Sequence, residues 1–368
     1  MTMTQPAREL APIHLPELPR EPLFSVLIRN YNYENYVSIA LDSLLRQTYT
    51  NFEAVVCDDG STDRSVDIIQ GYERKDPRIK LVRQENGGPT SAANTAFASS
   101  KGELVCFLDA DDVFRPSKLE RVLATFRGNP RCGHCADRVQ PISSDGERQG
   151  HPFPDISDQG WAGPAALKEG GRNVFPPMSG LSFRRDVLSL LLPMPLKLRR
   201  LEDYYLSATA RFLTEVTLAP ECLTEYRIHG GNRSGASGDN LSSCLSPFDP
   251  QVHQNFVERL ETVVPFQQQF LRQFYGPEVA EALRIEDNPR YWYLLLTIRV
   301  LRGKRSGTIR PFSDQEMIRH VSGRADKRLW RALTLLPHPL AAWAYRFWRS
   351  PSQLKSIAKA AVLPLIRR

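Results

Sequence analysis

The chain has 368 residues, 41% of them hydrophobic and 24% charged, a composition that excludes a disordered or fibrous protein and is typical of a globular one. The formal charge is +7, but Arg324–Arg368 holds ten Lys or Arg and one Asp, so this tail carries +9 and the remaining residues −2. Because the body is slightly acidic, the charge argues against nucleic acid as a partner. No stretch reaches the ~18 consecutive apolar residues of a membrane-spanning helix.

The first 22 residues are polar and rich in proline, and we expect a disordered lead-in without the apolar core of a signal peptide. Six cysteines scattered along the chain favour a reducing, cytoplasmic location. Cys132-Gly133-His134-Cys135 has the spacing of a metal or redox site. A second ligand pair is missing, however, so we interpret Cys132 and Cys135 as ordinary reduced thiols.

Short apolar runs alternate with helical patterns over the first 108 residues. The predicted strands are Phe24–Ile28, Phe52–Cys57, Ile79–Val82 and Leu104–Leu108. The alternation predicts right-handed βαβ crossovers and a mainly parallel sheet. Polar residues follow three of these strands, at Arg29–Asn32, Asp58–Asp63 and Asp109–Asp112, and so would lie at the carboxyl edge of the sheet, where open α/β sheets bind ligands. Asp63 is a suitable N-cap for the helix that follows it.

Asp109 and Asp111 come directly after the strand at 104–108, which we expect to be buried on both faces. In an extended backbone, residues two apart point the same way, so both carboxylates would converge. Converging carboxylates need a shared proton or a hard cation held by oxygen atoms. A solvated acidic turn is the alternative for this motif taken alone.

Six short motifs in register resemble glycosyltransferase family 2, whose members have the GT-A fold. The motifs are Ser25–Asn32, Asp58–Asp63, the Asp-x-Asp motif at Asp109–Asp112, Met178–Gly180, Leu201–Tyr204 and Tyr226–Asn232. The resemblance covers residues 23–235 and implies a nucleotide-sugar half at 23–112 and an acceptor half at 113–235. We therefore expect an α/β protein, with a Rossmann-like, mainly parallel sheet, flanking helices and a C-terminal helical extension.

The rest of the chain predicts further elements. These are helices at 116–126, from Leu201 to Phe212 and at 289–302, a strand near 135–142, a linker at 236–250, a helical region at 251–320 and a basic, aromatic, amphipathic tail at 321–368. Pro265 should kink or end its helix. The irregular stretch up to Pro177 would shape the acceptor pocket.

The resemblance also implies roles for individual residues at a donor site. Asp111 would be the principal ligand of Mn²⁺ or Mg²⁺, and Asp109 would contact the ribose or the ion. His229 is either a third ligand or a packed or surface histidine. Asp59 is placed to accept from the ring N–H of the base and Tyr31 to stack on it.

By the same resemblance Asp203 is the base that takes the proton of the acceptor hydroxyl, supported by Glu202. Stabilisation of a helix start is the alternative explanation for Glu202. One base without a separate nucleophile implies inversion, and the missing Gln-x-x-Arg-Trp signature implies a non-processive enzyme. Arg29 departs from the family, where a small residue or proline is common, and could bind a phosphate or stack on the base.

The expected reaction transfers a sugar from a nucleotide sugar, a UDP-sugar, to a hydroxyl of a sugar or lipid-linked acceptor, in cell-surface polysaccharide or glycolipid synthesis. One alternative is an inactive nucleotide-sugar-binding scaffold with the same fold. Another is a haloacid-dehalogenase-like phosphatase with Asp109 as nucleophile, although that family usually places this strand first and here it is fourth.

The tail places aromatic residues among arginines. Trp330, Trp343, Phe347 and Trp348 alternate with basic side chains, a composition typical of a segment at a membrane interface. We therefore expect the enzyme to be peripheral on the inner face of a membrane. The alternative is an amphipathic helix packed on the catalytic domain.

Overall fold

The computed structural model describes residues 9–154, 159–168, 170, 175–198, 200–229, 250–302, 313–321 and 324–349. The chain divides into two compact units. The first comprises Met1–Leu167, Asn173–Asp239 and Phe266–Ala282, and the second Lys168–Arg172, Asn240–Pro265 and Leu283–Arg368. The first unit thus contains the predicted glycosyltransferase domain except for Lys168–Arg172, together with a helical segment that follows the predicted linker. That linker lies outside the described residues except for Pro250.

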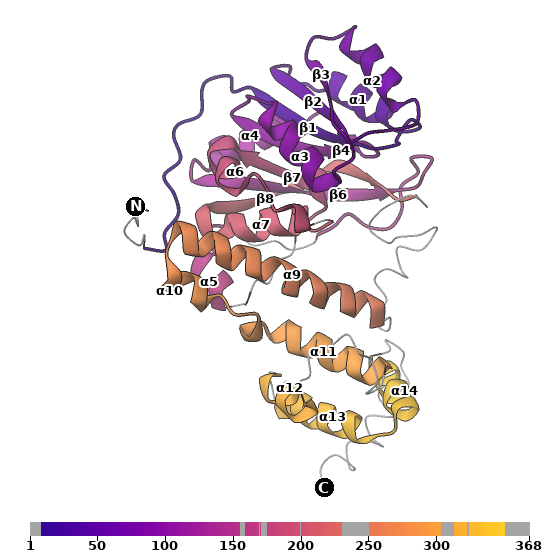
Figure 1. Cartoon of the computed structure of the whole chain (residues 1–368), viewed down its shortest axis with the longest axis vertical. Helices are drawn as coiled ribbons and strands as arrows, with labels where there is room; N and C mark the ends of the chain where they lie inside the picture. Colours follow the sequence, from indigo (N-terminus) through magenta and orange to yellow (C-terminus); the bar gives the residue numbers. More distant parts are fainter. Residues whose placement is uncertain are drawn as a thin grey trace. The chain divides into compact units, whose positions relative to one another are not determined.

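Within the described residues, one sheet of eight strands forms the centre of the first unit (Figure 1). The strands are β1 (Phe24–Asn30), β2 (Phe52–Asp58), β3 (Ile79–Arg83), β4 (Leu104–Asp109), β5 (Val113–Phe114), β6 (Cys132–Ile142), β7 (Leu181–Arg184) and β8 (Glu215–Arg227). Their order is β3-β2-β1-β4-β7-β6-β8-β5. The first four are parallel, as predicted, whereas β7 runs antiparallel to both β4 and β6.

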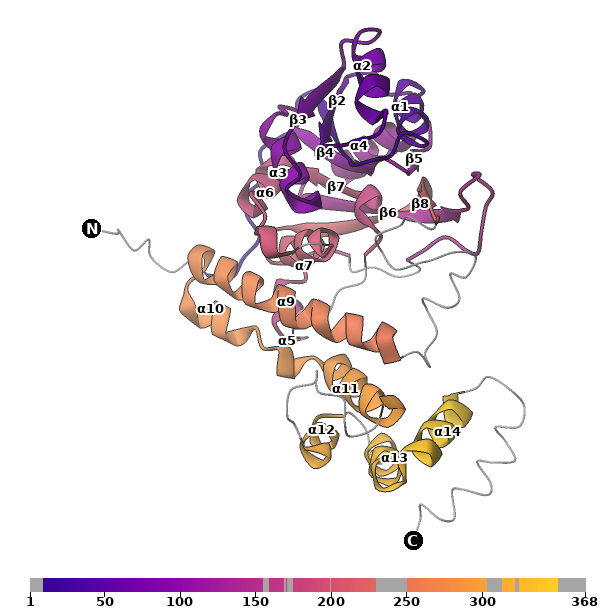
Figure 2. The ribbon, with the colours of Figure 1, turned by 45° about the vertical axis from the view of Figure 1, so that its right-hand side comes forward.

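Helices cover both faces of this sheet (Figure 2). The helices of this part of the chain are α1 (Val37–Leu45), α2 (Ser65–Glu73), α3 (Pro89–Ala98), α4 (Lys118–Gly128), α6 (Arg185–Leu191) and α7 (Glu202–Leu213), with 3₁₀ turns η1 (Met178–Gly180) and η2 (Leu196–Leu198). A further short helix, α5 (Gly163–Lys168), lies away from the sheet (Figure 1). Alternate residues of β1 and β4, such as Val26 and Leu108, form one core with α1 and α4. Helix α3 packs on β1 and β2. The apolar residues of β4 are fully buried, which confirms that both faces of this strand are covered.

Residues 9–22 are held against the first unit, in contrast to the expected disordered lead-in. The amide of Ile13 donates to the carbonyl of Leu213 at 2.7 Å, and the Tyr49 hydroxyl donates to the carbonyl of Pro22 at 2.7 Å. Proline lacks an amide donor but keeps its carbonyl acceptor, so a proline-rich segment can still be fixed by donors of the folded body. Composition alone does not reveal those donors.

The helices beyond the linker are α9 (Pro250–Phe274), α10 (Pro277–Ala282), α11 (Pro289–Arg302), α12 (Asp314–His320), α13 (Arg324–Leu335) and α14 (His338–Arg349), with a 3₁₀ turn η3 (Ile285–Asp287). The helix at 289–302 is confirmed. Pro265 was expected to kink or end its helix; it does not end it, because α9 continues through it to Phe274, and a kink stays a prediction. Buried Val263, Val264 and Leu271 on either side supply packing that outweighs one lost backbone hydrogen bond. No described helix is both long and apolar enough to cross a membrane.

A buried ion pair joins α4 to β6 beneath the carboxyl edge of the sheet. The Lys118 ammonium donates to the Asp137 carboxylate, and both side chains are fully buried. Thr224 of β8 also donates to Asp137, at 2.9 Å. Burial raises the pKa of Asp137, while the charge and hydrogen bond of Lys118 act in the opposite direction. Removal of either partner would leave an uncompensated buried charge.

We predict that Lys118→Met lowers the free energy of unfolding at neutral pH by about 3–5 kcal/mol, because the carboxylate of Asp137 loses its counter-ion. The matched control is Arg121→Met, which removes an exposed ion pair with Glu221 from the same helix and should cost at most about 1 kcal/mol. Urea unfolding followed by fluorescence measures both. The loss in Lys118→Met should shrink at acidic pH, since the raised pKa lets Asp137 become neutral; equal losses in the two variants would contradict the assignment.

Candidate active site

The backbone turns immediately after β4, between Asp109 and Asp111. β4 ends at Asp109, and the amide of Asp112 donates to the Asp109 carbonyl at 3.0 Å, which closes a turn over Ala110 and Asp111. The backbone from Asp109 to Asp111 is therefore not extended, and the ground for expecting the two carboxylates to point the same way is absent. The two carboxylates instead have different partners, described below.

Asp109 binds the arginine at the end of the neighbouring strand. Arg29 lies opposite Asp109 in the β1–β4 register, and its Nε donates to Asp109 Oδ1 at 3.1 Å, with Nη2 bonding the same oxygen. Its Nη1 lies 3.9 Å from Oε2 of Glu202. Burial lowers the pKa of Arg29, but the charges of Asp109, Glu202 and Asp203 outweigh burial and raise it above its ordinary value. Arg29 is therefore a permanent cation among three acids.

The two predicted acids of the acceptor side occupy the first turn of α7. Glu202 is buried, and its Oε1 accepts a hydrogen bond from the Thr90 hydroxyl of α3 at 2.6 Å. Asp203 is half-buried, and its Oδ1 accepts from the amide of Tyr204 at 2.7 Å. The positive end of a helix favours negative charge at these positions. The structure thus brings Glu202 and Asp203 near Asp109, which is predicted to lie on the donor side, with Arg29 among the three acids.

Asp111 binds His229, which follows β8. The two side chains are 3.0 Å apart, from Nε2 of His229 to Oδ2 of Asp111. The His229 ring packs on Tyr36 of the loop after β1, with ring centroids 4.8 Å apart. Burial raises the pKa of Asp111, the hydrogen bond from His229 lowers it, and the charge of Asp109 raises it further. The structure thus brings two predicted metal ligands, Asp111 and His229, into contact.

Ser179, Arg227 and Asp112 hold the turn in place. No individual role is predicted for them from the sequence. Ser179 of η1 accepts from the Asp109 amide at 2.9 Å and donates to the carboxylate of Asp112. The amide of Arg227 donates to Asp112 Oδ1 at 2.8 Å, and its guanidinium donates to the Asp111 carbonyl at 2.8 Å. Burial, then the charges of Asp111 and Asp109, raise the pKa of Asp112 well above its usual range. Ser179 and Arg227 belong to motifs of the family resemblance, which was the available signal.

Asp59 organises the loop that begins α3. Its Oδ1 accepts from the amide of Gly87 at 2.8 Å and from Gln84 Nε2 at 2.7 Å, and its Oδ2 accepts from the amide of Gly88 at 2.9 Å. Gly88 has φ +86°, a conformation that favours glycine. Tyr31 is half-buried in the loop after β1. Contacts of Asp59 and Tyr31 with a nucleotide base remain predictions.

The turn after β4 offers two side chains, Asp111 and His229, as possible ligands of a metal ion. Across the parts of the chain that the structure describes, no group of three or more His, Cys, Asp or Glu side chains could hold a metal ion. Asp111 and His229 nevertheless place an oxygen and a nitrogen 3.0 Å apart. Mg²⁺ is commonly bound by one or two carboxylates together with substrate phosphates, and imidazole also binds divalent metals. The donors therefore fit an ion that arrives with a diphosphate.

The Cys132-x-x-Cys135 motif is structural. Both thiols are buried, and burial raises the pKa of Cys132 to about 11 and that of Cys135 well above its usual range. Burial also lowers the pKa of His134 to about 4, and its ring stacks on Phe183 at 4.1 Å between centroids. Thiols with raised pKa values are poor nucleophiles and poor metal ligands, which agrees with their interpretation as ordinary reduced thiols.

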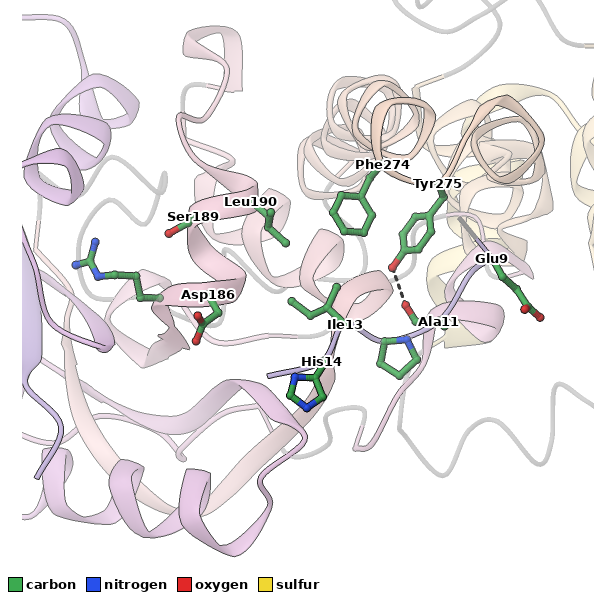
Figure 3. Close-up of a pocket in the computed structure, with 11 residues that line it drawn as sticks. Glu9, Ala11, Ile13, His14, Asp186, Ser189, Leu190, Phe274 and Tyr275 are labelled. Carbon is green, nitrogen blue, oxygen red and sulfur yellow. Dashed lines mark hydrogen bonds between the residues drawn. The ribbon is translucent and has the colours of Figure 1, made fainter. Parts of the chain in front are cut away.

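A separate groove of about 770 Å³ lies away from the acids, between the N-terminal segment, α6 and the end of α9 (Figure 3). Tyr275 forms part of its wall, and its hydroxyl donates to the carbonyl of Ala11 at 2.9 Å. None of the predicted site residues lines this groove. It is therefore distinct from the candidate active site.

Comparisons with known proteins identify the family and the fold. Residues 25–190 match the family model described as glycosyl transferase family 2. The chain is 39% identical over 239 residues to an uncharacterized glycosyltransferase of Nostoc sp., covering 63% of this chain and 74% of that protein. It is 33% identical over 152 residues to hyaluronan synthase of Pasteurella multocida, covering 41% of this chain and only 16% of the synthase.

Among solved structures, residues 1–349 of S. aureus TarS, crystallised with UDP, are similar with a TM-score of 0.52 and 17% identity. The alignment covers 89% of this chain and 93% of that one. This likeness confirms the predicted GT-A fold. Together with the family match, it leaves the phosphatase alternative without support.

We predict that Arg29→Gln lowers the free energy of unfolding by about 3 kcal/mol, because the acids around Asp109 and Glu202 lose their buried counter-ion. Arg29→Lys should cost less, since it keeps the charge and loses only the planar contact. The control Arg64→Gln removes an exposed pair with Glu34 and should be nearly neutral. Denaturant unfolding gives these values, and an Arg29→Gln variant as stable as the control would remove Arg29 from this role.

Proposed function

Because the chain belongs to glycosyltransferase family 2, we propose that it transfers a sugar from a nucleotide sugar, specifically a UDP-sugar, to an acceptor hydroxyl with inversion. One observation carries the proposal: Arg29 joins the carboxylate at the end of β4 to the two acids at the start of α7. The donor-side and acceptor-side acids are therefore adjacent, as a direct transfer between two substrates requires.

On the donor side, Asp111, His229 and Asp109 would hold Mn²⁺ or Mg²⁺. The ion, when bound, would act as a Lewis acid on the diphosphate leaving group. The chain's own residues fix the geometry: Arg227 holds the carbonyl of Asp111, and His229 orients its carboxylate. Tyr31 and Asp59 would bind the base.

On the acceptor side, Asp203 would take the proton of the attacking hydroxyl. Glu202 supports it indirectly, because its hydrogen bond to Thr90 and its approach to Arg29 fix the first turn of α7. A single base without a covalent nucleophile gives inversion at the anomeric carbon. The missing Gln-x-x-Arg-Trp signature supports a non-processive reaction.

The acceptor would be a sugar or a lipid-linked sugar in the synthesis of a cell-surface polysaccharide or glycolipid. Relatives named as hyaluronan and chondroitin synthases support a role in polysaccharide synthesis. We place the enzyme in the cytoplasm, peripheral on the inner face of the membrane, because the tail from Arg324 onward carries a net charge of +9.

For Asp111→Asn, we expect turnover to fall by about 10²-fold or more, because several kcal/mol of charge stabilisation on the leaving group would be lost. Sugar transfer from a panel of nucleotide sugars is measured with and without a chelator, and thermal shift identifies the donor that binds. Asp67→Asn, at an exposed position of α2, serves as the matched control. An Asp111→Asn enzyme with near-normal, chelator-resistant activity would defeat the metal assignment.

Replacement of the base should separate chemistry from donor binding. Asp203→Asn is expected to abolish transfer while leaving the dissociation constant for UDP with Mn²⁺ about the same, because the base acts only on the acceptor proton. Isothermal titration calorimetry measures the affinity, and a product assay measures the transfer. If affinity collapses together with activity, Asp203 belongs to the donor site and the assignment fails.

A further inference from the structure

Exposed apolar side chains gather at the junction of α13 and α14, which lie in the yellow part of the chain in Figure 1. Their exposed fractions are 85% for Leu335, 41% for Leu336, 55% for Leu340 and 64% for Trp343. We call these four residues the α13–α14 tip. Single exposed apolar residues are ordinary, but a group of them on a folded protein marks a surface that binds something.

Several other residues of these helices are buried inside the second unit, so the exposure of the tip is not a consequence of poor packing. Trp330, Leu333 and Tyr345 are buried, and α11 contacts both helices. The rings of Trp330 and Tyr345 stack with centroids 5.6 Å apart, and the Tyr345 hydroxyl lies 3.3 Å from that of Thr297. Trp330 is thus a core residue, which corrects its expected place at a membrane interface.

The charge around the tip selects the kind of partner. Lys327, Arg328 and Arg331 lie on α13, with Arg328 and Arg331 exposed. The only acidic residue in the sequence from Arg324 to Arg368 is Asp326, against ten basic ones. A second copy of this chain would bring like charges together, whereas an anionic surface would attract them.

We infer that the α13–α14 tip inserts into the headgroup region of an anionic lipid membrane. Leucine and tryptophan side chains partition into the boundary between headgroups and acyl chains, and the flanking basic residues bind anionic headgroups. The inference deepens the proposed peripheral location by naming the residues that make the contact. The inference rests on the proposed function in one respect: the purpose of docking would be access to a lipid-linked acceptor.

Vesicle flotation of the full chain tests the inference. Wild-type protein should float with phosphatidylglycerol-containing vesicles at low salt, and not with pure phosphatidylcholine vesicles. The triple variant Leu335→Ser, Leu340→Ser and Trp343→Ser should bind anionic vesicles about tenfold or more weakly. Leu196→Ser is the matched control, because Leu196 is 58% exposed on η2 of the first unit. It should float as the wild type does.

Three results would overturn the inference. Wild-type protein that ignores anionic vesicles is the first, and a triple variant that floats as well as the wild type is the second. The third is a wild-type dimer in light scattering that the triple variant converts to a monomer, since a second copy would then be the occupant. Sugar transfer is the measurement that separates the two proposals. If wild-type protein and Asp111→Asn both float normally but wild-type protein transfers no sugar from any donor, docking stands and the proposed function fails.

Discussion

Charge compensation at the carboxyl end of β4 is the constraint on which the rest of the structure depends. Asp109, Asp111 and Asp112 follow a strand buried on both faces, and ionised carboxylates so close together repel and lose solvation. Each is met by a different element: Arg29 from β1 binds Asp109, His229 after β8 binds Asp111, and the backbone of β8 binds Asp112. The two halves of the sheet are therefore joined by polar contacts at the site itself.

A second compensated charge pair lies next to the residues that hold the acidic turn. Lys118 and Asp137 form a buried pair whose neighbours include the Ser179 carbonyl, and Ser179 holds both Asp109 and Asp112. Buried ion pairs contribute little net stability, but they penalise any arrangement that separates the partners. A polar network that is satisfied in only one arrangement gives the acidic turn a defined geometry, which apolar packing alone would not.

The sequence was sufficient where one local rule decided the structure. Short apolar runs located β1 to β4, and their alternation with helical patterns predicted the parallel pairing. Both predictions need only residues that are close in the sequence. Asp63 is not the N-cap of α2, which is Arg64, but it lies one residue earlier and its carboxylate accepts from the Ser65 amide at 2.9 Å. Prediction failed where distant groups decided. Asp109 is bound by Arg29, 80 residues away, and residues 9–22 are fixed by partners far along the chain, such as the Leu213 carbonyl and the Tyr275 hydroxyl.

Arg29 explains why Asp109 and Asp111 are not equivalent despite their spacing. Asp109 already has a guanidinium, a permanent cation, as partner, whereas the partner of Asp111 is an imidazole. A divalent ion would therefore displace less favourable charge pairing at Asp111 than at Asp109, which supports Asp111 as the principal ligand. Because the other side of Arg29 faces Glu202 and Asp203, a change in the charge at Asp109 would reach these two acids through one guanidinium. Arg29 therefore couples the end of β4 electrostatically to the start of α7.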